Sequence, residues 1–417
     1  MGLLALKLLM SRQRGSKHLG GQIQARNRSG QTFQRTSGAI YIPCCRCEML
    51  PVLPAYLMHF YVLGSKGVKK FRIELYIIVD PCYLNSWLQI ATKLRIEELA
   101  VVLPSTYNAN CYDFPCALFV DDGCRNTIEH LCLGGCAFHP TAGFGNLRRL
   151  QLFWVRITVD ELGCLIFNSS ALEHLTLKYC NTITYLKIPS LLQHLSYLMV
   201  PWECVCFAPC NTIYNARANL PSIVPNIETL SISSVSEVIN TPIVPVKFLH
   251  LKYLSISLEA EHGAFPPVYD YFSLVSFLDA CPVLETFHLA VSQTRMKHDS
   301  VFGDPSHLRQ RREYRHENIK TVKISGFCSA KSMVELTCHI LENATSLECL
   351  MLDTIDDVDD IGRHVHETGE CNPIGRHMIK EAREALLAIE RYIMKKVPST
   401  VKLNVLEPCR RCHAFAA

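Results

Sequence analysis

The sequence has little charge and no long apolar run. Of its 417 residues, 19% are Asp, Glu, Lys or Arg and 49% are hydrophobic, which argues against a chain disordered throughout and predicts a sizeable core. No stretch approaches the roughly 20 consecutive apolar residues that span a bilayer. The best one, residues 55–63, is short and contains His59. We therefore expect no membrane partner.

Acidic residues are absent from residues 1–47, which contain eight Lys or Arg. The remainder carries 34 basic and 38 acidic residues, so a globally basic nucleic-acid-binding protein is excluded. The first 47 residues also lack hydrophobic periodicity. We interpret them as a disordered basic tail, with an organellar transit peptide or a misjoined start as alternatives.

Motifs for catalysis are also missing. We find no Gly-rich phosphate loop, no nucleophile elbow, and no Ser/His/Asp or paired-carboxylate arrangement that the sequence places together. We predict no enzyme activity, no catalytic residue, no cofactor and no metal site.

Two terminal or near-terminal patterns invite a metal or haem interpretation. Cys409, Cys412 and His413 match the haem-attachment spacing and offer three of the four ligands of a structural zinc site. Haem attachment needs an export or organellar machinery, and a fourth zinc ligand is missing. The acidic stretch 356–362 resembles a calcium loop, but Thr368 stands where that loop needs Glu. We predict a solvated acidic loop and unpaired tail cysteines.

Cysteine, by contrast, is abundant. The chain has 21, an odd number with no recognisable signal peptide before them, and many fall where a repeat fold buries its side chains. We interpret them as reduced, core-filling thiols and expect a cytoplasmic or nuclear protein.

A hexapeptide with the spacing LxxLxL recurs along the chain. In the copy at 172–177, Leu175 and Leu177 share one face of a short strand, while His174, Thr176 and Lys178 face the other way. Copies begin at residues 68, 96, 128, 147, 172, 183, 192, 227, 251, 284, 319 and 347. The clearest intervals are 19 to 35 residues, which is typical of leucine-rich repeats.

Several segments between the copies have helical patterns. They are residues 85–92, 158–167, 271–280 and 332–343. Thr158 with Glu161, and Ser332 with Glu335, have the spacing of a capping box. Helix, turn and strand in repetition predict an α/β leucine-rich-repeat solenoid (horseshoe) of alternating helices and short parallel strands.

Three other segments stand out. Residues 201–226 contain four prolines and could be an inserted loop or a damaged repeat. A helix is predicted from Met378 to Tyr392, and a strand that could close the sheet edge over 401–406. The domain boundaries we expect are a tail and linker (1–67), the solenoid (68–355) and a C-terminal cap of acidic loop, helix and strand (356–417).

The concave face of such a fold is where a partner would bind. The residues predicted to bind protein there are Arg149, Gln151, Phe153, His174, Thr176, Lys178, Tyr253, His288 and Lys323, with Glu98, His130, Ser255 and Asp353 also expected on that face. Phe153 and Trp154 form an aromatic pair suited to an interface anchor. We assign Trp154 to the inward face.

Several longer stretches between residues 68 and 417 have a characteristic order: VKKFRIEL, ITVDELGCLIFNSSALEHLTLKYC, FSLVSFLDACPVLETFHL, ELTCHILENATSLECLMLD and VPSTVKLNVLEPC. In these stretches the chain resembles a plant family with an F-box, leucine-rich repeats and a C-terminal FBD-like segment. The resemblance implies a substrate-recognition arm of a Skp–cullin–F-box ubiquitin ligase, whose F-box docks on the ligase adaptor subunit. No F-box is recognisable before Val68, where tryptophan is absent.

Three hypotheses follow. The first is a non-catalytic protein-binding module of unknown target, with the ligase adaptor as a possible partner. The second is a truncated family member that acts as a competitor or is non-functional. The third, a small enzyme or haem protein, depends on the terminal Cys and His residues alone.

Overall fold

The computed structural model describes residues 25–26, 32–33, 39–41, 57–61, 69–75, 78–104, 111–119, 127–141, 144–180, 192–202, 211–235, 237, 239–259, 269–292, 298–303, 308–310, 315–355 and 375–408. The repeat expected at 183, the acidic loop 356–362, and Cys409, Cys412 and His413 lie outside these residues.

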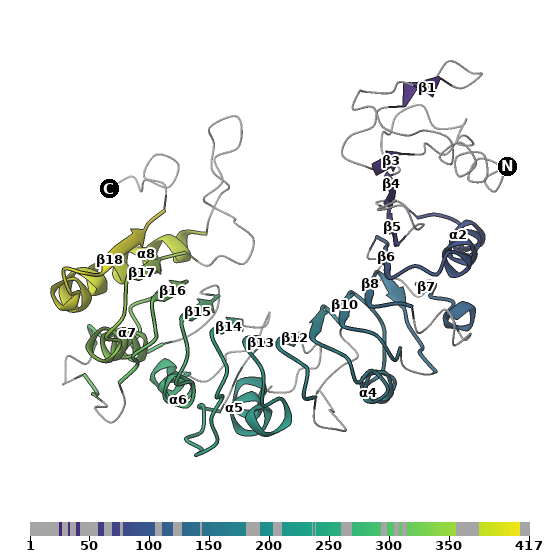
Figure 1. Ribbon diagram of the computed structural model, residues 1–417. Helices are drawn as coiled ribbons and strands as arrows, with labels where there is room; N and C mark the ends of the chain where they lie inside the picture. The colour runs from purple at the N-terminus through teal and green to yellow at the C-terminus, as the bar shows by residue number, and fades with distance from the viewer. Residues whose placement is uncertain are drawn as a thin grey trace.

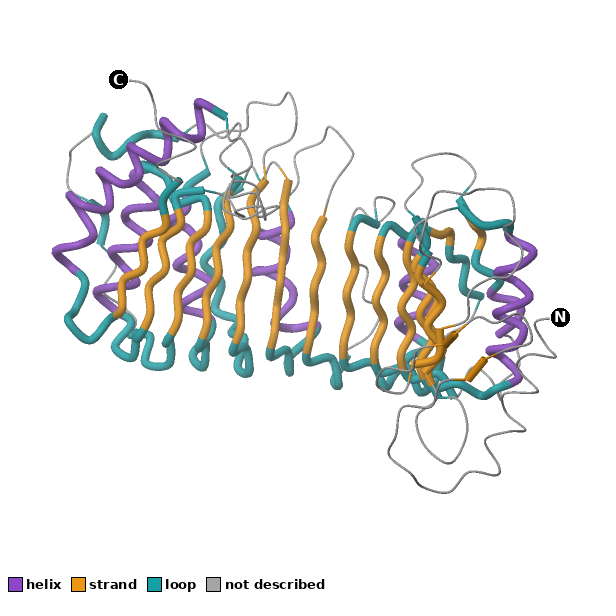
Figure 2. The backbone as a smooth tube through the Cα atoms, turned by 90° about the horizontal axis from the view of Figure 1, so that it is seen from above, coloured by secondary structure: helices purple, strands orange, loops and turns teal. Residues whose placement is uncertain are grey.

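Within the described residues, one sheet of fourteen strands contains nearly every strand. Its parallel part comprises β5 (Lys70–Glu74), β6 (Glu98–Val102), β8 (His130–Gly134), β10 (Arg149–Phe153), β11 (His174–Lys178), β12 (Tyr197–Trp202), β13 (Thr229–Val235), β14 (Tyr253–Glu259), β15 (Thr286–Val291), β16 (Thr321–Ser325), β17 (Cys349–Asp353) and β18 (Lys402–Leu406). These strands lie side by side in chain order (Figure 2). β18 pairs with β17 at one edge, as predicted for residues 401–406.

At the other edge the sheet continues with two antiparallel strands. β4 (Leu57–Tyr61) pairs antiparallel with β5, and β3 (Ala39–Tyr41) pairs antiparallel with β4. Both strands fall within residues 1–67, for which the sequence predicted no strand. Two minor pairs complete the strands: β1 (Ala25–Arg26) with β2 (Thr32–Phe33), and β7 (Tyr112–Asp113) with β9 (Cys136–Ala137).

The sheet curves into an arc, with the strands on its inner side and helices on its outer side (Figure 1). The helices are α2 (Pro81–Lys93), α4 (Val159–Phe167), α5 (Thr212–Ile223), α6 (Val275–Ala280), α7 (Lys331–Asn343) and α8 (Arg376–Ala388). The 3-10 turns Cys116–Phe119, Tyr271–Leu274 and Met394–Lys396 and the π-helical turn Ile389–Ile393 complete them. Each of the five predicted helical segments is confirmed. No helix among the described residues is long and apolar enough to span a membrane.

The core lies between the sheet and the helices because alternate strand residues point there. Leu175 and Leu177 are 0% and 2% exposed, and the same two positions are buried in each neighbouring strand. Register pairs Leu150 with Leu175, and Leu175 with Leu198. The buried side chains therefore form continuous rows, and every repeat depends on its neighbours for burial.

One repeat is out of the predicted frame. The copy assigned to residue 192 begins at Leu195, because Tyr197 pairs with His174 and Leu198 with Leu175. Leu192, Leu195 and Leu198 are three residues apart, so the leucine spacing fits two frames. The hydrogen bonds to β11 select the second frame.

Residues 201–226 are not an inserted loop, because they contain helix α5. Asn211, at its N-cap, makes no side-chain hydrogen bond there. The Glu237 carboxylate accepts from the Ile213 and Tyr214 amides at 3.2 Å. The buried Arg217 guanidinium donates to the carbonyls of three other residues, at 2.7–3.0 Å. The Glu237 side chain and backbone carbonyls from the chain after α5 therefore complete this repeat.

The first predicted capping box is confirmed. The Thr158 hydroxyl accepts from the Glu161 amide at 3.2 Å, and the Glu161 carboxylate accepts from the Thr158 amide at 2.8 Å. The second, over Ser332 and Glu335, is wrong. Helix α7 begins one residue earlier, after Ala330, and the Ser332 hydroxyl accepts from the Tyr271 amide at 3.3 Å.

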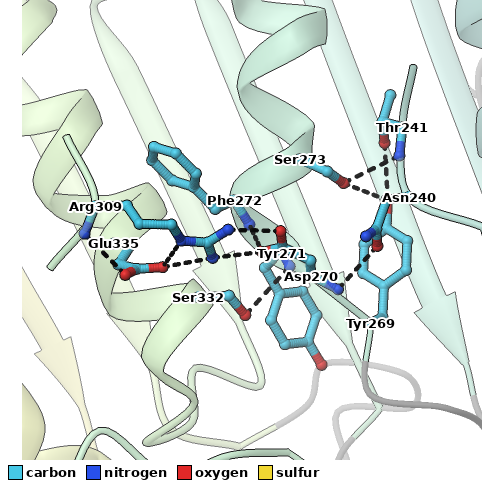
Figure 3. Close-up of polar contacts among 10 residues, drawn as sticks. All are labelled: Asn240, Thr241, Tyr269, Asp270, Tyr271, Phe272, Ser273, Arg309, Ser332 and Glu335. Atoms are coloured by element: carbon cyan, nitrogen blue, oxygen red, sulfur yellow. Dashed lines mark hydrogen bonds and ion pairs between the residues drawn. The ribbon is translucent and has the colours of Figure 1, made fainter. Parts of the chain in front are cut away.

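Glu335 instead holds Arg309 (Figure 3). Its side chain is fully buried, and its carboxylate accepts from Nε of Arg309 at 2.7 Å and from the Arg309 amide at 2.9 Å. The same guanidinium donates to both oxygens of Asp270, at 2.7 and 2.8 Å, and lies 4.9 Å from the centre of the Phe272 ring. These bonds, with Asp270 first, raise the pKa of Arg309. Arg309 thus ties the connection between β15 and β16 to two helical segments.

A row of charged side chains runs along the amino ends of the strands, at the second position of the hexapeptide. It consists of ten charged residues and Ser196: Lys69, Glu97, Glu129, Arg148, Glu173, Ser196, Glu228, Lys252, Glu285, Lys320 and Glu348. Ion pairs join Arg148 to Glu173 at 3.0 Å and Lys320 to Glu285 at 2.9 Å. Exposed pairs contribute little stability individually. The signs alternate from Glu228 to Glu348, which favours the observed stacking order of those repeats.

The cysteines follow the predicted pattern in part. The eleven in the described residues form no disulfide with one another, and Cys136, Cys180, Cys281, Cys328 and Cys338 are buried. Cys164 is exposed, and Cys132 and Cys349 lie on the inner face of the sheet rather than in the core. Burial raises the pKa of Cys132 and Cys180 to about 11.

Candidate protein-binding surface

The inner face of the arc, which we call the concave face, is built from three columns of side chains. Each parallel strand contributes one residue to each column, because the strands are paired in register and alternate residues point away from the helices. The first column is Lys70, Glu98, His130, Arg149, His174, Tyr197, Thr229, Tyr253, Thr286, Thr321, Cys349 and Lys402. The second runs from Arg72 to Asn404 and the third from Glu74 to Leu406.

All nine predicted binding residues lie in these columns. Arg149, His174 and Tyr253 are in the first, Gln151, Thr176, His288 and Lys323 in the second, and Phe153 and Lys178 in the third. They span β10 to β16, so the structure does not bring them together at one point. Their role in binding remains a prediction.

Two of the expected exposed side chains are buried. Thr176 is 5% exposed, since Gln151 and Met199 stand beside it in the second column. Asp353 is 0% exposed, and its Oδ1 accepts from the Ile355 amide at 3.1 Å. Thr176 therefore offers a partner little surface, and Asp353 offers none.

Trp154 does not point into the core as predicted. It is 40% exposed and has φ of 51°, and Tyr179, 36% exposed, has φ of 58°. Their rings stack with centroids 4.7 Å apart and planes 5° apart. We call these two residues the aromatic pair. The sequence missed it because alternation along a strand fails where the backbone turns left-handed.

The left-handed turn occurs at the same place in four strands. Gly135, Trp154, Tyr179 and Gly326 each follow the third-column residue and have φ between 51° and 70°, a range that most side chains avoid. A Cβ on Gly135 would lie 2.4 Å from the Leu103 carbonyl oxygen. The chain turns at the same place after β10 and after β11. The strand that precedes β10 in the sheet, β8, and the strand that precedes β11, β10, have therefore also turned, which leaves room for the aromatic side chains of Trp154 and Tyr179. Bulky residues at positive φ are strained, and such strain is frequent at ligand-binding positions.

Positive charge gathers on the concave face over β8 to β12. We call this stretch the basic segment: its column residues include His130, Arg149, His174 and Lys178 and no carboxylate. The nearest column carboxylate is Glu98 on β6, which forms an ion pair with Lys70 on β5 and lies 3.4 Å from Nδ1 of His130 at the edge of the basic segment. Burial first, and then Arg149, lower the pKa of His174, so at pH 7 Arg149 and Lys178 carry the charge.

The concave face changes character toward the C-terminus. Over β13 to β16 its column residues are mostly hydroxyl-bearing: Thr229, Ser231, Ser233, Tyr253, Ser255, Ser257, Thr286, Thr321 and Ser325. His288 lies between two of them, with Nδ1 3.4 Å from Oγ of Ser255 and Nε2 3.4 Å from Oγ of Ser325. This half is polar and nearly neutral, so the two halves of the face suit different ligand surfaces.

A family model for the leucine-rich-repeat domain of At1g61320/AtMIF1 matches residues 64–207 and 202–410. The chain belongs to this plant leucine-rich-repeat family. No curated protein matches it. The At1g61320/AtMIF1 domain model covers all the parallel strands, which agrees with the sheet of in-register repeats and with the α/β leucine-rich-repeat fold.

Membership of the At1g61320/AtMIF1 leucine-rich-repeat family bears on function at a general level. Leucine-rich repeats are typically non-catalytic modules that bind proteins through an extended concave surface. The match starts at residue 64 and concerns the repeats, so it supports the solenoid interpretation and leaves the F-box and FBD-like assignments as proposals.

Proposed function

We propose that this chain is a protein-binding, horseshoe-shaped solenoid that holds an acidic, extended segment of a partner protein on its basic segment, β8 to β12. The observation that carries the proposal is the aromatic pair beside that segment. Trp, Tyr and Arg are the residues most enriched at binding hot spots. Here Arg149 lies on β10, and Trp154 and Tyr179 directly follow β10 and β11.

Charge complementarity supports an acidic partner. Arg149 and Lys178 stand on neighbouring strands with no column carboxylate between β8 and β12. A positive surface next to exposed aromatic rings fits a segment with carboxylates flanking an apolar or aromatic anchor. Such binding should weaken as ionic strength rises.

The experiment is selection from a displayed library of random 12-residue peptides with the full chain as bait. We expect the selected peptides to be acidic and to contain an apolar anchor. Trp154→Ala should weaken the best peptide about 30-fold, since hot-spot truncation costs about 2 kcal/mol or more. Fluorescence anisotropy with the labelled peptide measures this.

The matched control is Phe167→Ala. Phe167 is 60% exposed on α4, which lies on the outer side of the arc, so its removal should leave affinity unchanged. Selection of basic peptides, or equal affinity of Trp154→Ala and wild type, would refute the proposed surface.

We further propose that the solenoid serves as the substrate arm of a ubiquitin-ligase adaptor in the cytoplasm or nucleus. The resemblance of residues 68–417 to F-box proteins with an FBD-like C-terminus supports it, and the free thiols of the described residues suit a reducing compartment. The competing proposal is a family member without a ligase connection, acting as a competitor for the target.

A pull-down of the ligase adaptor subunit separates these two proposals. The unmodified chain is run beside the same chain carrying a known F-box fused at residue 48. Capture by both supports the ligase arm. Capture by the fusion alone rejects it and leaves a recognition module without its ligase connection.

A further inference from the structure

Three metal-ligating side chains converge where two repeats meet. Asp279 lies near the end of α6, His316 precedes β16, and His339 lies in α7. One ligand atom from each lies within 4.8 Å of the other two. The Nε2 atoms of His316 and His339 are 3.4 Å apart, and Nε2 of His316 is 3.8 Å from Oδ1 of Asp279. We propose that Asp279, His316 and His339 bind a divalent cation of the zinc class.

The spacing suits zinc. Ligands about 2.0–2.1 Å from a tetrahedral zinc ion lie about 3.3–3.4 Å from each other. The two imidazole nitrogens already have this separation, and the Asp279 carboxylate oxygen lies 3.8 Å from Nε2 of His316 and within 4.8 Å of the His339 ligand atom. Two imidazoles with one carboxylate are a common zinc ligand set that leaves a fourth position open.

The imidazoles are held from several sides. The backbone of His316 is fixed by bonds from its amide to the Asn343 carbonyl, at 3.0 Å, and from the Thr345 amide to its own carbonyl, at 3.2 Å. The His339 and Phe272 rings are nearly perpendicular, with their centroids 5.9 Å apart. Nδ1 of His339 lies 3.3 Å from the side-chain nitrogen of Asn343. Phe272 is the ring that Arg309 covers in Figure 3. Such supporting contacts fix ring orientation in metal sites.

Ligation through both Nε2 atoms also sets the tautomers of the two rings, because a metal needs the lone pair of each nitrogen. Without a cation, Nε2–H of His339 donates to Nε2 of His316, because Nδ1 of His339 accepts from the Asn343 side-chain nitrogen. On ligation the His339 proton would move to Nδ1, and the Asn343 side-chain amide would turn so that its oxygen accepts from it.

The site is reachable from solvent. Asp279 and His316 line a small cleft together with Lys247, Cys281 and Arg315. His339 does not line it, so the cleft reaches the cluster from the side of Asp279 and His316. Because the ligands come from α6, the segment before β16 and α7, a bound cation would join adjacent repeats and stabilise the folded chain.

The probe is cobalt(II), followed by zinc, with the full chain after chelator treatment. Exposed thiols such as Cys82 and Cys164 are first alkylated, since they also bind these metals. We expect one cobalt per chain, visible bands of four-coordinate geometry, and no near-ultraviolet bands from thiolate ligands. Zinc should then displace cobalt and raise Tm by several degrees.

Variants identify the ligands. His339→Gln and Asp279→Asn should each weaken cobalt binding at least tenfold. The matched control is His298→Gln, because His298 also lies beside a carboxylate, Glu381, at 3.4 Å, but not in the cluster. If His339→Gln fails to fold, the cobalt affinity of Asp279→Asn tests the proposal instead, because this substitution keeps the shape of the side chain. Unchanged affinity in Asp279→Asn, thiolate bands, or no cobalt binding would overturn the proposal, and none of these outcomes bears on the concave surface.

Discussion

Replacing Gly326 with alanine is expected to lower the free energy of unfolding by about 2 to 5 kcal/mol, the sum of a left-handed backbone and a steric clash. Gly326 has φ of 70°, and a Cβ there would lie 1.8 Å from the Val291 carbonyl oxygen. That atom belongs to the backbone of β15, which cannot rotate away as a side chain can.

The clash matters more than the dihedral angle. Trp154 and Tyr179 occupy the corresponding place after β10 and β11 with positive φ, so the fold accepts side chains there when the neighbouring strand also turns. β15 instead continues to Val291 beside Gly326. Only a residue without a Cβ fits beside an extended neighbour.

Urea unfolding monitored by circular dichroism measures the effect. The control is Gly303→Ala, where the nearest atom to a new Cβ, the Ser300 carbonyl oxygen, is at an ordinary 3.5 Å. That substitution should change stability by about 0.5 kcal/mol or less. Equal stability of the two variants would contradict the assigned turn.

Replacing Arg309 with alanine should cost about 2 to 4 kcal/mol at pH 7. It leaves the Glu335 carboxylate, which is fully buried, without its guanidinium, and an uncompensated buried charge typically costs about 3 to 5 kcal/mol. We expect a loss below the upper end of that range because the Arg309 side chain is 49% exposed, and solvent weakens its ion pair with Glu335. Asp270 loses its partner too, but it is partly exposed and can be hydrated.

The loss should depend on pH. In the variant, the buried Glu335 carboxylate has lost its counter-charge, and a buried carboxyl group is costly only in its ionised form, so the loss of stability should be smaller at acidic pH than at pH 7. Adding Glu335→Gln to Arg309→Ala should recover part of the loss at pH 7 and remove its pH dependence. Urea unfolding of the single and double variants at pH 7 and pH 4.5 measures the loss of stability and its recovery. If Arg309→Ala lost the same stability at both pH values, a buried charge could not be the cause.

The sequence predicts the repeats well because each one is a local pattern. The spacing of Leu172, Leu175 and Leu177 specifies a strand with one buried face, and the Thr158–Glu161 pattern specifies where α4 begins. Both depend on residues within one turn or strand. The ambiguous frame at Leu192 shows the limit of this information, since only pairing with β11 resolves it.

The candidate site was predictable in part. Alternation placed Arg149, His174 and Lys178 on the face opposite the core, and their strands confirm that placement. The aromatic pair was missed, because the exposure of Trp154 depends on the turn that Gly135 begins on the preceding strand. The charged row was visible at the second position of the hexapeptide, but its pairing depends on which repeats are neighbours.

By itself, the sequence determined the α/β leucine-rich-repeat architecture, the buried rows of leucines and the order of strands and helices, since these follow from periodicity and short-range capping. Tertiary structure alone decided the partners of Glu335, Glu237 and Arg217, and the meeting of Asp279, His316 and His339. Those contacts join residues more than 20 positions apart, and no local pattern encodes which long-range neighbour a buried polar side chain will find when the repeats stack.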